Sequence, residues 1–250
     1  NGIDPLEVID KYGADALRLT LITGNAPGND MRFYWERVES SRNFANKVWN
    51  ASRFIMMNLG DEQPTKPEDA DLLPVDKWIL SKVNTLAKDV TENMDKYELG
   101  IAVQKVYDFI WEEFCDWYIE IAKVRLYKKE EDPKAANTAL WVLKTVLANA
   151  LKMLHPYMPF ITEEIFCTLV RKRRPSCLLR GRNIQRNGIA KEEADVETVK
   201  VLVKGIRNIR SEMNVPPSRK AKYFIVSPDE NLRELFASHK DIYSQLISAK

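Results

Sequence analysis

The sequence of 250 residues contains little cysteine, histidine or glycine, and it has no long apolar run. No stretch approaches the roughly 18 apolar residues that a membrane-spanning helix needs, which excludes an integral helical membrane protein. Residues 1–10 are polar and acidic, so we expect no secretory signal there. The three cysteines are too scattered for a disulfide framework or a zinc site, and they predict reduced thiols in a cytoplasmic protein: Cys115, Cys167 and Cys177.

The sequence also lacks the common catalytic motifs. It contains no glycine-rich phosphate loop, no H-E-x-x-H and no G-x-S-x-G. Of its two histidines, we expect His155 to cap a helix end and His239 to be solvated. Glu112, Glu113 and Asp116 have the paired carboxylates used in acid–base chemistry, but with lysines nearby they better fit a charged helix surface. The sequence therefore predicts no catalytic residue and no metal site.

Helical periodicity is the main feature that the sequence does have. Asp4 and Pro5 predict a helix start, Gly13 ends that helix, and a second helix is expected over residues 14–22. Apolar residues three or four positions apart predict further helices over residues 35–59, 75–97, 99–127, 135–154 and 160–169. Short loops join them, so the sequence predicts a mainly α fold built as an antiparallel helix bundle.

The last 60 residues have a different pattern. A helix is expected over residues 192–213, and the sequence NVPPS at residues 214–218 stops it. Residues 222–227 (KYFIVS) are β-branched and aromatic, which predicts a strand. Two short helices are expected over residues 228–238 and 241–249. This part therefore predicts a small α+β appendage at the C-terminal end of the bundle.

The segment RNFANKVWNASRF, residues 42–54, combines an apolar stripe with polar side chains. At helical spacing the apolar residues form a core stripe: Phe44, Val48, Ala51 and Ile55. The other faces carry guanidinium groups, amides and one indole ring: Arg42, Asn46, Trp49, Asn50 and Arg53. Such side chains suit phosphates, base edges and unstacked bases of RNA. A polar helix surface without a partner is an equally good interpretation from composition alone.

A second segment, WEEFCDWYIEI at residues 111–121, crowds four aromatic side chains into a short helical stretch. Phe114 and Trp117 lie on the predicted apolar stripe, whereas Trp111 and Tyr118 share another face. Taken alone, this pattern is more typical of a helix core than of a binding site.

Several segments together resemble the valyl-tRNA synthetases, a family of class I aminoacyl-tRNA synthetases. The resemblance covers the whole chain except residues 170–190, and it is carried by NGIDPLEVIDKYGADALR, RNFANKVWNASRF, EFCDWYIE, LHPYMPFITEEIF and IRSEMNVPPSR. It implies a piece of a longer ligase that starts just after the family's KMSKS signature. Residues 1–30 would end the catalytic region, residues 31–170 would form the α-helical anticodon-binding domain, and residues 191–250 would begin a C-terminal junction.

The resemblance also implies a function and a set of site residues. The complete ligase would join valine to tRNA with ATP and Mg²⁺, whereas this chain alone would bind the anticodon stem-loop of tRNA(Val) without a cofactor or catalysis. Phe54 and Ile119 match positions that hold the unstacked central anticodon base, and Asn46, Asn50 and Arg53 match polar positions beside it. The complete set of expected RNA-binding residues is Arg42, Asn43, Asn46, Lys47, Asn50, Arg53, Phe54, Asp116, Tyr118, Ile119 and Lys123.

Residues 171–190 do not fit the family. Seven basic and no acidic side chains lie within residues 171–186, where the family has an acidic stretch and a strand-like apolar element. Three interpretations remain open: a shifted reading frame in the gene, a basic RNA-binding loop, and a solvated loop. A shifted frame predicts a poorly ordered segment, because the apolar anchor is then missing.

A helical protein–protein interaction module is the alternative function, because helix bundles serve both purposes. Polar and aromatic side chains on two helices favour RNA, since an interaction module more often exposes an apolar stripe. We expect a cytoplasmic monomer that binds neither DNA nor membranes.

Overall fold

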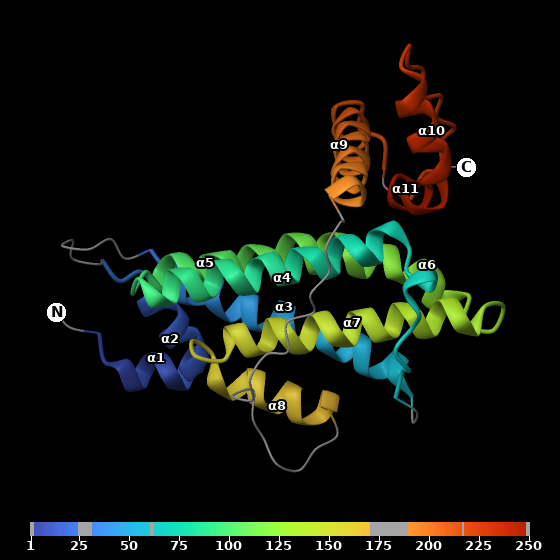
Figure 1. Ribbon diagram of the computed structural model, residues 1–250. Helices are drawn as coiled ribbons and strands as arrows, with labels where there is room; N and C mark the ends of the chain where they lie inside the picture. Colours follow the sequence, from blue (N-terminus) through green and yellow to red (C-terminus); the bar gives the residue numbers. More distant parts are fainter. Residues whose placement is uncertain (1–2, 25–31, 61–62, 171–189, 217, 249–250) are drawn as a thin grey trace.

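The computed structural model describes residues 3–24, 32–60, 63–170, 190–216 and 218–248, and its ordered elements are helices (Figure 1). The α-helices are α1 (Pro5–Tyr12), α2 (Ala14–Ile22), α3 (Trp35–Leu59), α4 (Pro74–Asp95), α5 (Leu99–Asp108), α6 (Glu120–Tyr127), α7 (Pro133–Leu154), α8 (Pro159–Val170), α9 (Ala190–Glu212), α10 (Glu230–Ser238) and α11 (Lys240–Leu246). A 3-10 turn, η1 (Asp69–Asp71), precedes α4, and a π-helix, η2 (Phe109–Ile119), joins α5 to α6. The predicted mainly α fold is thus confirmed.

The bundle is formed by α3, α4, the continuous rod α5–η2–α6, and α7, which lie side by side (Figure 1). Each helix buries one apolar stripe at the bundle centre; Phe44 of α3, Trp78 of α4 and Leu143 of α7 are all 0% exposed. Burial of side chains of this size contributes about 1.5–3 kcal/mol each, before the cost of ordering the chain. Within the described residues, no helix has the length and apolar content to span a bilayer.

The first two helices dock on the rest of the protein through both apolar and polar contacts, with Leu19 of α2 in the main core and Val8 of α1 packed in one cluster with Val38 of α3. Gly13 separates α1 from α2 and has φ +90°, a backbone conformation that side chains with a Cβ rarely adopt. Asp15 of α2 accepts hydrogen bonds from the backbone N–H groups of Phe160 and Ile161, which are unpaired donors of the first turn of α8. His155 caps α7, as expected, and its Nδ1 lies 2.8 Å from the hydroxyl of Thr162.

The middle of the long third helix departs from the expected geometry. The sequence predicts one α-helix over residues 99–127, and the structure does form one continuous rod there. Residues 109–119, however, are π-helical, so their backbone hydrogen bonds run to the fifth residue along the chain and the turns are wider. A residue spacing of three or four therefore does not identify the faces of η2, which carries the whole EFCDWYI sequence.

The predicted strand over residues 222–227 is wrong. A strand requires a hydrogen-bonded neighbour, and among the described residues the only bridge is from the N–H of Ala221 to the carbonyl of Ser248, at 3.2 Å. Phe224 and Val226 are consequently 87% and 92% exposed. The appendage is organised by the buried guanidinium of Arg210 instead, which donates to the carbonyls of Pro216, Arg219 and Ile247.

Two other expectations concern the C-terminal half. His239 is buried rather than solvated, with 6% exposure, because it lies just before α11, which packs against α6 and α9. The basic segment at residues 171–189 lies outside the described residues, as does the prediction that it is poorly ordered. The proposed domain boundaries at residues 30, 170 and 190 stay predictions.

Candidate nucleic-acid interface

The candidate interface is the surface where α3 lies beside η2 and α6. Ring stacking joins α3 to the α5–η2–α6 rod, because Phe44 of α3 stacks on Tyr107 of α5 with ring centroids 4.3 Å apart and on Trp111 of η2 at 6.4 Å. Aromatic pairs of this kind add about 0.5–1.5 kcal/mol beyond the area they bury. The stack leaves little freedom for α3 to rotate against η2, so the polar faces of the two helices keep a fixed relation.

Two lysines join the expected site residues across this surface. The ammonium of Lys47 on α3 donates to a carboxylate oxygen of Asp116 on η2 at 2.6 Å, and it lies 4.5 Å from the ring centroid of Trp111. The ammonium of Lys123 on α6 lies 5.4 Å from the ring centroid of Phe54 on α3. Two sequence segments about 70 residues apart are therefore brought into one surface by the fold, as the resemblance implies.

The polar side chains of α3 that were expected to bind RNA are mostly exposed. Asn43, Asn46, Asn50 and Arg53 are open to solvent, whereas Lys47 and Phe54 are half-buried. Arg42 is turned toward α1, because its guanidinium lies 5.7 Å from the ring centroid of Tyr12. The geometry thus collects amides, one guanidinium, one ammonium and one aromatic ring on the accessible side of α3.

Tyr118 corrects the expectation from the resemblance. Its side chain is 0% exposed, and its hydroxyl donates to Asp76 of α4 at 2.6 Å. Arg125 of α6 donates to both oxygens of the same carboxylate, at 2.5 and 2.8 Å. Tyr118 therefore links η2 to α4 through Asp76, and its side chain is not available for direct contact with RNA. The α-helical spacing placed it beside Trp111, but the wider turns of the π-helix place it in the core.

Ile119 is 5% exposed, so the structure offers little of its side chain to a ligand. Its role in holding a base stays a prediction. Sequence reasoning missed the pair formed by Asp76 and Arg125 altogether. The one available signal was an acidic residue among the apolar positions that begin α4, and a helix cap explains such a residue equally well; Asp76 does accept from the N–H of Leu73 at 3.0 Å.

Because Cys115 is buried in η2, we expect its thiol to react with a labelling reagent only when η2 opens. Burial raises the pKa of this thiol to about 12, although the nearby Lys47 lowers it. We expect alkylation by iodoacetamide at pH 8 to be about a thousandfold slower in the folded chain than in urea, because only the thiolate reacts. Mass spectrometry of the peptide that contains Cys115 measures both rates. Equal rates would contradict the burial of Cys115 in η2.

No group of three or more histidine, cysteine, aspartate or glutamate side chains converges among the described residues in a way that could hold a metal ion.

The chain is similar to known tRNA ligases in sequence and in fold. The family model for "Anticodon-binding domain of tRNA ligase" matches residues 76–225. The valine–tRNA ligase of Clostridium tetani is 53% identical over 252 residues that cover 100% of this chain and 28% of that protein. The valine–tRNA ligase of Clostridium perfringens is 54% identical over 232 residues, which cover 92% of the chain and 26% of that protein.

A solved structure shows the same fold at lower sequence identity. The apo form of methionyl-tRNA synthetase from Mycobacterium tuberculosis matches with a TM-score of 0.55 and 19% identity, over 65% of this chain and 34% of that one. The chain thus spans only about a quarter of the length of the curated relatives described above.

Proposed function

The chain belongs to the family of anticodon-binding domains of tRNA ligases, and we propose that it binds the anticodon stem-loop of tRNA(Val). The observation that carries this proposal is the surface shared by α3, η2 and α6. Exposed amides and a guanidinium surround a half-buried ring there, within a chain whose relatives are valine–tRNA ligases.

The proposed roles follow from the chemistry of each group. The ring of Phe54 stacks on an unstacked base, and Lys123 beside it neutralises a nearby phosphate. The amides of Asn46 and Asn50 donate to and accept from base edges. Arg53 forms no ion pair with any described residue and is free to bind a phosphate.

Lys47 and Asp116 are proposed to act as a pair. Their ion pair is 30% and 47% exposed at the two side chains, so RNA can compete for either partner. A phosphate would pair with the ammonium of Lys47, and a base amino group would donate a hydrogen bond to the carboxylate of Asp116. We place the contribution of Asn43 and Arg42 at the edge of the site, since Arg42 lies against α1.

The proposal for the complete protein is valine–tRNA ligation with ATP and Mg²⁺. We propose that this part of the protein supplies RNA contacts as a monomer, and that valine activation needs residues other than those described. The whole-protein activity is inferred from the relatives, of which the chain covers about a quarter.

Titration with the tRNA(Val) anticodon stem-loop at two salt concentrations tests RNA binding. Because each neutralised phosphate releases counterions, we expect affinity to fall about tenfold or more between 50 and 200 mM salt. An unrelated stem-loop of equal length is the control for charge alone. The absence of binding at low salt, or an affinity that does not depend on salt, would contradict the proposal.

A further inference from the structure

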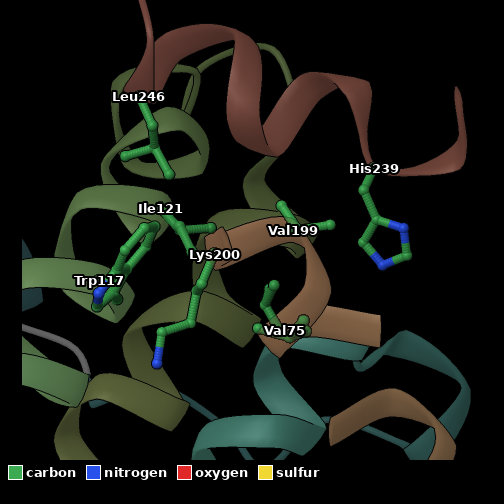
Figure 2. Close-up of a pocket in the computed structure, with 8 residues that line it drawn as sticks. Val75, Trp117, Ile121, Val199, Lys200, His239 and Leu246 are labelled. Carbon is green, nitrogen blue, oxygen red and sulfur yellow. The ribbon is translucent and has the colours of Figure 1, made fainter. Parts of the chain in front are cut away.

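Lys200 of α9 is buried against the side of η2 that does not form the candidate interface. Its residue exposure is 6%, and Figure 2 shows its side chain beside Trp117 of η2 and below Val199 of its own helix. The ammonium donates to Glu113 of η2 at 2.6 Å and lies 3.1 Å from Glu197. It also lies 5.5 Å from the ring centroid of Trp117. One buried cation of α9 therefore contacts η2 twice.

Such a buried cation is tolerated only with compensation. An unpaired ammonium would pay a large desolvation cost, and here two carboxylates and two aromatic faces offset that cost. The second face is Trp78 of α4, 5.0 Å from the ammonium. Glu197 is anchored in turn, because it accepts from the indole N–H of Trp78 at 3.1 Å and pairs with Lys82 at 2.9 Å. Burial alone would raise the pKa of Glu197, but these hydrogen bonds lower it below its ordinary value.

Ion pairs thus join the π-helix η2 to two neighbouring helices, in addition to the hydrogen bond from Tyr118 to Asp76 of α4. Lys47 of α3 holds it through Asp116, and Lys200 of α9 holds it through Glu113, only three residues earlier. Arg207 of α9 adds a second cation over Trp117, at 5.5 Å. A π-helix of this length is rare, and an uncommon backbone conformation persists only where its surroundings impose it. Loss of these contacts from α9 should therefore increase the local opening of η2 more than that of the rest of the bundle.

We propose that Lys200 is a positioning residue for RNA recognition: by pairing with Glu113 it holds η2 in the geometry that presents Asp116 to Lys47 and to the RNA. The part of this inference that concerns RNA binding rests on the proposed function. The part that concerns the backbone of η2 does not depend on RNA.

The test compares Lys200→Met with Lys82→Met in the 250-residue chain. Methionine keeps the length of the side chain and removes the charge. Lys82→Met removes an ion pair from the same cluster, between α4 and α9; Lys82 attracts Glu113 of η2 electrostatically, but its hydrogen-bonded partner is Glu197. Amide hydrogen exchange by mass spectrometry measures the opening of η2, and titration with the tRNA(Val) stem-loop measures binding.

We expect Lys200→Met to speed amide exchange in residues 112–119 about tenfold and to weaken stem-loop binding about five- to 20-fold. Lys82→Met should change both much less, because Lys82 pairs with Glu197 and not with Glu113. Lys200→Arg, which keeps the charge, should restore most of the binding. If Lys200→Met does not fold, Glu113→Gln replaces it in the comparison with Lys82→Met. This variant removes the ion pair between Lys200 and η2 but leaves the ion pair between Lys200 and Glu197.

Unchanged exchange in η2 upon loss of Lys200 would overturn the inference, as would faster exchange with undiminished binding. Equal effects of the Lys82 and Lys200 variants would also overturn it, because they would indicate a general role of the α4–α9 contact. If the parent chain binds no stem-loop, the proposed function fails. The exchange result then still decides whether Lys200 holds η2.

Discussion

Replacing Asp76 with alanine should lower the free energy of unfolding by about 3–5 kcal/mol. The carboxylate is 0% exposed and accepts four hydrogen bonds, from both Nη atoms of Arg125, the hydroxyl of Tyr118 and the N–H of Leu73. Alanine would leave a buried guanidinium without its counter-charge. Chemical denaturation with a helix signal measures the loss.

The phenol of Tyr118 makes the effect larger than that of a simple ion pair. Burial first, and the negative charge of Asp76 second, raise the pKa of Tyr118 well above its ordinary value. The hydroxyl therefore stays protonated at neutral pH and donates to Asp76. Without the carboxylate, this hydroxyl also loses its acceptor in the core.

A second acidic residue on α4 provides the matched control. Asp89 pairs with Lys105 at 2.8 Å, but both side chains are more than a third exposed. Asp89→Ala should cost less than about 1 kcal/mol, because solvent screens such a pair. Equal losses for Asp76→Ala and Asp89→Ala would contradict the central role of the buried carboxylate.

Replacing Phe54 with alanine should weaken stem-loop binding by about 1–3 kcal/mol, or roughly 5- to 150-fold in Kd. The ring is half-buried at the edge of the candidate interface, with the Lys123 ammonium above it. The alanine variant loses the stacking of a base on this ring, and it also loses the cation–π contact that aligns Lys123. Fluorescence anisotropy with a labelled stem-loop measures the change.

Two further substitutions separate stacking from packing. Phe54→Leu keeps most of the apolar volume but has no ring, so it should lose nearly as much affinity as alanine. Phe54→Tyr keeps the ring and should bind nearly as well as the parent chain. Met57→Ala is a control on the same helix, since Met57 is 73% exposed and is not among the predicted site residues. Full affinity of Phe54→Leu would reject the stacking role.

The long helices of the bundle could be predicted from the sequence because α3, α4 and α7 each carry an apolar stripe at helical spacing. Residues 35–59 were expected as one helix and are α3, and Gly13 separates α1 from α2 as its sequence position suggests. The core stripe of α3 was also predicted correctly at Phe44, Val48 and Ile55, whereas Ala51 is half-buried. Local spacing was sufficient there because α3 is a regular α-helix.

The geometry of η2 could not be predicted in this way. Its sequence is rich in aromatic residues and gives no local sign of a hydrogen-bond pattern that depends on neighbouring helices. The contacts that hold it come from distant positions, such as Asp76 on α4 and Lys200 on α9. The error at Tyr118 and the failure to identify Lys200 have this same origin.

The predicted strand failed for a related reason. Residues 222–227 alternate between half-buried and exposed side chains, as a strand would, but alternation does not supply a partner strand. For the exposed amides and Arg53 of α3, the sequence predicted residue types and accessibility, whereas the resemblance alone supplied their expected role.

The measurement that tests the central claim most directly is a competition between two stem-loops that differ only at the central anticodon base. Binding of the 250-residue chain to the tRNA(Val) loop and to the altered loop is compared at one salt concentration. We expect the cognate loop to bind at least about tenfold more tightly, because one stacked and hydrogen-bonded base is worth about 1–3 kcal/mol. Equal affinity for the two loops would contradict base recognition at α3 and η2 and would reduce the interaction to phosphate attraction.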